Sequence, residues 1–133
     1  MLAAIAMAAA MSRLPPPIRG DFDHDGRQDV AQVVRGSHGG YRLVVHRGAA
    51  GHPDVVVTAL RRDELHDFFL TIEKPGRLET WCGKGGDDGG DPNAPCRRFV
   101  TLRGDTLAFG MRESTESVAI WTGGRFEVVL ISD

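Results

Sequence analysis

The chain has almost no excess of charge and no long apolar run. Its 16 basic and 18 acidic residues give a formal net charge of -2, which provides no electrostatic footprint for nucleic acid or an anionic membrane surface. The apolar run of residues 1–11 is too short to span a bilayer as a helix. We therefore expect no nucleic-acid partner and no membrane span in the mature form, which we take to be a monomer.

Cysteine is scarce, since Cys82 and Cys96 are the only two. A zinc site would need further ligands, and the chain has no C-x-x-C or H-x-x-x-H pattern. An even pair in an exported chain is usually a disulfide, whereas in the cytosol the same pair would be two buried thiols. We favour the disulfide, which would close a glycine-rich loop of roughly 15 residues and stabilise the fold by about 3 kcal/mol.

Recognisable catalytic motifs are also missing. The sequence has no G-x-S-x-G elbow, and neither cysteine stands beside a plausible base. The histidines are scattered and lie mostly beside glycine or charged residues, which is typical of exposed positions: His24, His38, His46, His52 and His66. We therefore expect that the protein is not an enzyme.

The N-terminal segment indicates export. Residues 1–11 have the length of a signal-peptide hydrophobic region, and Ala8 to Ala10 supply an A-x-A-like cleavage site. No basic residue precedes the run, so the alternatives are a translation start further upstream or an ordinary buried helix. We assign residues 1–11 to a signal-peptide remnant, 12–19 to a proline-rich spacer and 20–133 to one domain of a periplasmic or secreted protein.

Frequent turn residues, including 17 glycines, favour short strands over long helices. The pattern predicts a single all-β domain, mainly antiparallel, with at most one short helix. Residues 61–69 are either that helix or a loop that runs into a strand. Strands are expected at residues 30–34, 41–46, 54–60, 68–73, 78–81, 98–103, 106–111, 118–122 and 126–131.

The clearest local unit is the C-terminal hairpin. Gly123 and Gly124 form a two-residue turn that accepts the positive φ angles of a type I′ hairpin. This turn fixes the register of the flanking strands. The predicted cross-strand pairs are Trp121 with Phe126 and Ala119 with Val128.

The segment DFDHDGRQD contains alternating carboxylates, which can converge on one cation in a tight loop. Its ligands would be Asp21, Asp23, Asp25, the carbonyl of Arg27, and Asp29. Gly26 allows the sharp turn at position six of such a loop. Oxygen-only ligands in a flexible loop favour Ca²⁺ over zinc, copper or Mg²⁺. An acidic solvated turn is the alternative, but four carboxylates this close would repel one another without a cation.

The loop is not an EF-hand, because position twelve is Gln32 instead of a bidentate glutamate and no helix flanks it. The segment GDFDHDGRQDVAQVV instead resembles the calcium loops of FG-GAP and VCBS-type repeats, which run directly into a strand. Those repeats build β-propellers, whereas this chain has one such loop and no internal repeat. The resemblance therefore implies a local calcium site and gives no ground for an adhesive function.

Over most of residues 20–133 the chain also resembles a group of small bacterial periplasmic proteins. The shared features are this loop, the segment PGRLETWCGKG with a second cysteine downstream, and the closing hairpin. The resemblance implies an exported, disulfide-bonded domain and no particular activity.

Two function classes remain open. One is an exported calcium-binding, disulfide-stabilised interaction module with an unknown protein partner. The other is a periplasmic inhibitor or immunity-type protein that acts on a cell-wall-directed enzyme. A hydrolase is least favoured, because a fully ligated Ca²⁺ leaves no open position for water. Asp87, Asp88 and Asp91 lack the alternate spacing of a cation loop, so we favour a solvated loop there over a second site.

Overall fold

The computed structural model describes residues 14–87, 89 and 91–133, and nearly all its regular structure is antiparallel β. The predicted signal-peptide remnant lies outside these residues. Two single-turn 3₁₀ helices, η1 (Ser37–Gly39) and η2 (Arg62–Glu64), occur in connections. The strands are β1 (Ile18–Gly20), β2 (Asp29–Arg35), β3 (Tyr41–His46), β4 (Val55–Leu60), β5 (Phe68–Glu73), β6 (Gly76–Glu79), β7 (Phe99–Leu102), β8 (Thr106–Met111), β9 (Thr115–Trp121) and β10 (Phe126–Ser132).

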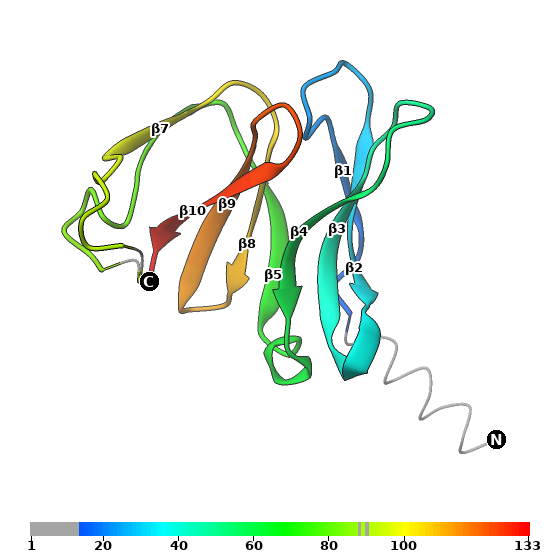
Figure 1. Ribbon diagram of the computed structural model, residues 1–133, viewed down its shortest axis with the longest axis horizontal. Helices are drawn as coiled ribbons and strands as arrows, with labels where there is room; N and C mark the ends of the chain where they lie inside the picture. Colours follow the sequence, from blue (N-terminus) through cyan, green and yellow to red (C-terminus); the bar gives the residue numbers. More distant parts are fainter. Residues whose placement is uncertain (1–13, 88, 90) are drawn as a thin grey trace.

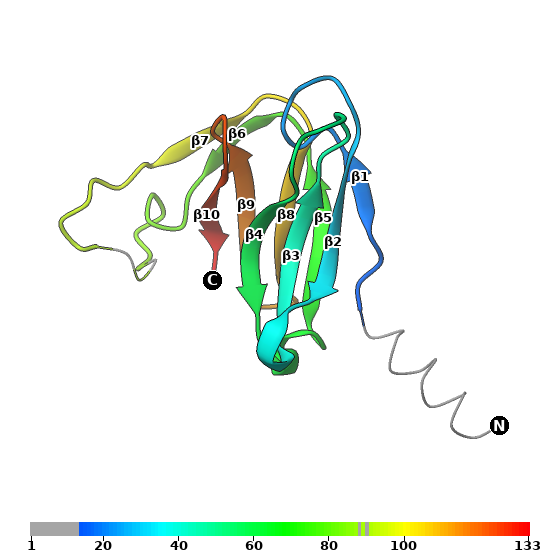
Figure 2. The same ribbon diagram turned by 45° about the vertical axis from the view of Figure 1, so that its right-hand side comes forward.

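Two four-stranded sheets face each other as an open sandwich (Figure 1). The first has the strand order β1-β2-β3-β4 and the second β10-β9-β8-β5. Contacts between β4 and β10 and between β1 and β5 align the sheet edges. The β6–β7 pair forms a separate ribbon beside the second sheet, and Figure 2 shows its connecting loop extending away from the sandwich.

Strand alternation divides the apolar residues between two cores. The main core lies between the sheets and includes Leu43 and Val45 from β3 with Leu107 from β8, all fully buried. On the opposite face of the second sheet, Ala108 and Val118 pack with residues of the β6–β7 ribbon. The second sheet is therefore covered on both faces, which explains why β8 is almost continuously apolar.

The predicted strands are all present, with boundaries within a few residues of those expected. The hairpin register is confirmed, because Trp121 pairs with Phe126 and Ala119 with Val128. The first strand was not predicted. It begins at Ile18, inside the segment assigned to the spacer, and pairs with β2.

Residues 61–69 form no α-helix. A 3₁₀ turn at Arg62–Glu64 is followed by β5 from Phe68, so the alternative of a loop that runs into a strand is correct. The side chain of Glu64 accepts a hydrogen bond from the Arg61 amide at 2.9 Å, which closes this turn. Among the described residues, no helix has the length and apolar character needed to cross a membrane.

Cys82 and Cys96 form a disulfide with a Cα–Cα distance of 6.0 Å. It closes the long β6–β7 connection, which contains no strand among its described residues. The amide of Trp81 donates to the Leu130 carbonyl at 2.9 Å, and Lys84 Nζ donates to the Ile131 carbonyl at 2.9 Å. These bonds attach the start of the loop to the outer edge of β10.

Replacement of both cysteines by serine should lower the free energy of unfolding by about 3 kcal/mol, because the unfolded chain regains the entropy of the open loop. Urea unfolding of the wild type and of the Cys82→Ser/Cys96→Ser variant measures the difference. An unchanged urea midpoint would show that the disulfide does not stabilise the domain.

Two glutamates on the second sheet form a titratable contact, Glu73 of β5 with Glu116 of β9. A hydrogen bond with Glu73, burial and repulsion by the Glu73 charge raise the pKa of Glu116 to about 7, while the positive charge of Lys84 acts in the opposite direction. The native state therefore binds a proton that the unfolded chain has already lost in the range between the ordinary glutamate pKa of 4.5 and about 7.

Stability from this contact should be present below the ordinary glutamate pKa and lost as the pH rises through about 7. Urea unfolding of the wild type and of Glu116→Gln across this range tests the expectation, because glutamine cannot ionise. The decline between acidic and neutral pH should be smaller in Glu116→Gln. Parallel pH profiles of the two proteins would contradict it.

Candidate metal centre

The acidic segment forms the loop between β1 and β2. Gly20 at the end of β1 pairs with Asp29 at the start of β2, so the loop is closed at its base by the sheet. Phe22 is 1% exposed and packs in the main core. A Cβ on Gly20 would collide with the Phe22 ring, so the absence of a side chain at Gly20 allows the ring to fold beneath the strand. The loop is thus anchored by one apolar side chain between two carboxylates.

Asp29 is fully buried and accepts hydrogen bonds from three backbone amides. Its Oδ2 accepts from the amides of Phe22 at 2.9 Å and Asp23 at 3.1 Å. Its Oδ1 accepts from the Gly48 amide at 2.8 Å, in the β3–β4 connection. Burial raises the pKa of Asp29, and the amide hydrogen bonds from Gly48 and Asp23 act in the opposite direction. Asp29 thereby joins two loops.

The remaining carboxylates fold the loop around themselves. Asp21 accepts from the Asp25 amide at 3.1 Å and from the Gly26 amide at 2.8 Å, using both of its oxygens. Asp25 accepts from the Arg27 amide at 2.8 Å. Gly26 has a φ of 87°, which a residue with a side chain rarely adopts, as the sequence motif predicts for the sharp turn.

Asp23 is paired with a cation of the protein itself. Arg47 Nε donates to Asp23 Oδ2 at 2.8 Å, and the side chain of Asp23 is fully buried. The Arg47 guanidinium also stacks 4.7 Å from the ring centre of Trp121. Burial opposes the ionised form of Asp23, but hydrogen bonds from Arg47 and then from neighbouring loop groups outweigh it and lower the pKa of this carboxyl.

Two overlapping groups of donor atoms result. Oxygens of Asp21, Asp23 and Asp29 all lie within 4.8 Å of one another, and the same holds for donor atoms of Asp23, Asp25 and His52. The four predicted carboxylates therefore cluster in a way compatible with a metal ion. Arg27 is exposed, and its carbonyl as a ligand stays a prediction.

The hydrogen bonds leave the carboxylates able to bind a cation. Each carboxylate oxygen has two lone pairs, and a hydrogen bond uses one of them. Each oxygen of Asp21 accepts one hydrogen bond from a backbone amide among the described residues, so one lone pair remains on each oxygen. Oδ1 of Asp29 likewise accepts a single described amide, whereas Oδ2 accepts two.

Sequence reasoning missed three residues that complete the site: Arg47, Gly48 and His52. The prediction that only a cation would offset the repulsion between carboxylates was incomplete, because Arg47 and the backbone amides already offset part of it. The glycine at position 48 is the sequence feature that could have indicated this contact. A Cβ there would collide with the Gln28 carbonyl oxygen, so only glycine lets this amide approach Asp29.

The other candidates do not join this cluster among the described residues. Asp87 and Asp91 are exposed, and each accepts a hydrogen bond from an amide two residues along the chain. Asp88 lies outside the described residues. Four of the histidines are exposed, including His24, as predicted, whereas His46 is half-buried and pairs with Asp54 at 3.0 Å.

No protein-family model, curated protein or solved structure matches the chain. The resemblance to FG-GAP and VCBS-type loops therefore stays a prediction.

The hydrogen bonds predict different structural roles for two carboxylates of the same loop. In the presence of chelator, Asp29→Ala should lower the free energy of unfolding by at least about 3 kcal/mol, since it leaves three amides without their acceptor. Asp25→Ala is the matched control and should change it by less than about 1 kcal/mol, because Asp25 is exposed. Chemical denaturation measures both. Equal losses in the two variants would contradict the assigned role of Asp29.

Proposed function

We propose that this protein is an exported, disulfide-stabilised β-sandwich that binds calcium in the β1–β2 loop and serves as a binding module. The observation that carries the proposal is the convergence of Asp21, Asp23 and Asp29, whose oxygens lie within 4.8 Å of one another. They belong to one loop held between two paired strands. A cation seated there would link the base of the loop to its tip.

Calcium is the cation that the loop chemistry favours. Carboxylate oxygens are hard ligands, and calcium accepts irregular sets of six to eight of them, whereas Mg²⁺ demands a near-octahedral shell. Asp21, Asp23, Asp25 and Asp29 supply the charge, and the Arg27 carbonyl adds a neutral oxygen. Arg47 cancels part of that charge at Asp23. The affinity is accordingly that of extracellular calcium modules, about 10⁻⁴ to 10⁻³ M.

The disulfide supports the proposed location. Disulfides form and persist in oxidising compartments and are rare in the cytosol. The Cys82–Cys96 bridge closes a glycine-rich connection that has little packing of its own. A periplasmic or secreted protein would keep this bridge and would also meet the millimolar calcium that a weak site requires.

The edges of the sandwich support a role in binding. Large apolar side chains that are well exposed among the described residues lie on edge strands: Val56 on β4, Ile72 on β5 and Val128 on β10. Val56 is 50% and Val128 43% exposed, and their strands are neighbours across the sandwich. Edge strands with apolar side chains can pair with a strand of a partner. On β10 the carbonyls of Leu130 and Ile131 are already bonded to the cysteine loop, which leaves β4 and the start of β10 for a partner. We place a protein partner on this side of the sandwich.

Calcium should stabilise the mature protein. At a free Ca²⁺ concentration of about 100 times Kd, the free energy of unfolding should rise by about 2.7 kcal/mol. Thermal melts and calorimetry with Ca²⁺, with Mg²⁺ and with chelator measure the response. Asp21→Asn and Asp25→Asn should abolish it, while Asp87→Asn, an exposed carboxylate of the cysteine loop, should retain it. A wild type whose melting is the same in Ca²⁺ and in chelator would refute the proposal.

A further inference from the structure

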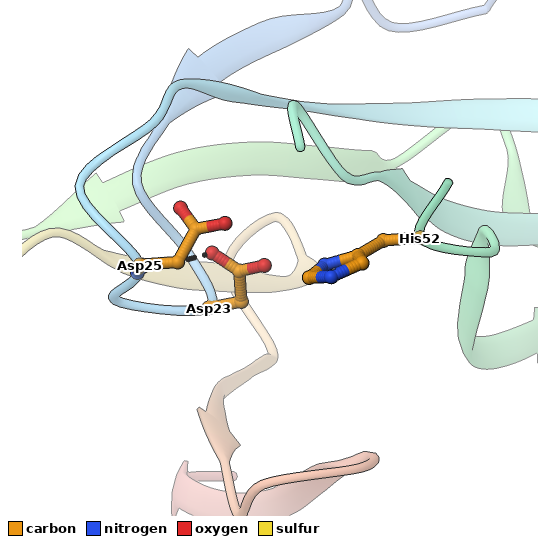
Figure 3. A group of neighbouring side chains, drawn as sticks. All are labelled: Asp23, Asp25 and His52. Atoms are coloured by element: carbon orange, nitrogen blue, oxygen red, sulfur yellow. Dashed lines mark hydrogen bonds between the residues drawn. The ribbon is translucent and has the colours of Figure 1, made fainter. Parts of the chain in front are cut away.

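The β3–β4 connection places a nitrogen donor beside the acidic loop. A ring nitrogen of His52 and carboxylate oxygens of Asp23 and Asp25 all lie within 4.8 Å of one another. Figure 3 shows the imidazole ring directed toward the Asp23 carboxylate, and Asp25 lies on the other side of Asp23. The three side chains come from two loops separated in sequence by strands β2 and β3. This donor set contains nitrogen and oxygen, unlike the oxygen-only set of the neighbouring carboxylates.

The position of His52 is set by bonds between the two loops. Arg47 donates to Asp23 and Gly48 donates to Asp29, both at 2.8 Å, so the start of the connection is attached to the acidic loop at two points. The His52 amide then donates to the Ala49 carbonyl at 3.3 Å, which closes a turn. Gly51 adopts a φ of 79° in that turn. This turn directs the β3–β4 connection back toward the acidic loop, so that His52 lies beside that loop.

We propose that His52, Asp23 and Asp25 form a mixed nitrogen and oxygen site for a divalent first-row transition cation such as Co²⁺ or Zn²⁺. Imidazole nitrogen suits these ions, whereas calcium prefers oxygen throughout. The inference builds on the proposed cation role of the acidic loop and extends it to a second class of ion. Because Asp23 belongs to both donor groups, the two ions compete for the loop.

The exposure of the three side chains fits an open binding position. Asp23 is buried and already oriented by Arg47, which holds its Oδ2. Asp25 and His52 are exposed, so solvent reaches the site from their side. A transition ion would gain one fixed carboxylate and two ligands that adjust to its geometry, and water would complete its shell. A single protein nitrogen then decides which ion the loop prefers.

Titration of the full-length protein with Co²⁺, followed by its visible absorption and by calorimetry, tests the proposal. His52→Ala should weaken Co²⁺ binding by at least about tenfold, since even outer-shell changes weaken metal sites by that factor. It should leave the Ca²⁺ affinity unchanged. His66→Ala is the matched control, because His66 is also exposed, lies in a turn of the chain and is absent from this donor group. His52→Asp should strengthen Ca²⁺ binding and weaken Co²⁺ binding.

The outcomes separate this inference from the proposed function. Unchanged Co²⁺ affinity in His52→Ala, or an equal loss in His66→Ala, would overturn the inference while a calcium response of the wild type would still support the proposed function. A wild type that binds Co²⁺ through His52 but shows no calcium response would support the mixed site and refute calcium as the ion of the loop. Absence of both responses would refute both.

Discussion

The carboxylate of Asp29 joins two loops that the sheet alone would leave separate. It accepts amide hydrogen bonds from Phe22 and Asp23 in its own loop and from Gly48 in the β3–β4 connection. A buried carboxylate is tolerated only where such bonds replace water. The orientation of Asp23, and through Arg47 the contact with Trp121, depend on this junction. The acidic loop is therefore shaped by the fold before any cation is considered.

The negative charges of the loop are compensated by different groups at different depths. The deepest carboxylate, Asp29, is satisfied by neutral amides, and the next, Asp23, by the guanidinium of Arg47. The two outer carboxylates, Asp21 and Asp25, accept amides of the loop and face solvent more fully. The guanidinium of Arg47 offsets the charge of the buried Asp23, while water screens the charges of the more exposed outer carboxylates.

Local pattern was sufficient for most strands, because period-two alternation and glycine turns are properties of short segments. The hairpin at Gly123 and Gly124 is the clearest case, since the turn type alone determines the pairing of Trp121 with Phe126. Strand β1 escaped detection because its three residues follow a proline run and offer too little alternation. Its existence depends on pairing with β2.

In the candidate site too, the sequence identified some residues, while others could be found only from the fold. The spacing of Asp21, Asp23, Asp25 and Asp29 was sufficient to identify the carboxylates that cluster. Arg47 and His52 were not identifiable, because neither belongs to a motif and both reach the loop only after β3 turns back along β2. Tertiary contact also decided which carboxylate is structural, since nothing in D-x-D-x-D-G-x-x-D distinguishes buried Asp29 from exposed Asp25.

The gradient of burial across the loop has a kinetic consequence. The ion proposed for this loop would be hydrated and released on the solvent side, where Asp21 and Asp25 lie, while the amide bonds at Asp29 keep the strands in place. Exchange would then be limited by the removal of water from the ion, not by opening of the sandwich. The proposed site would then follow rapid changes in the surrounding ion concentration without altering the shape that the rest of the protein presents.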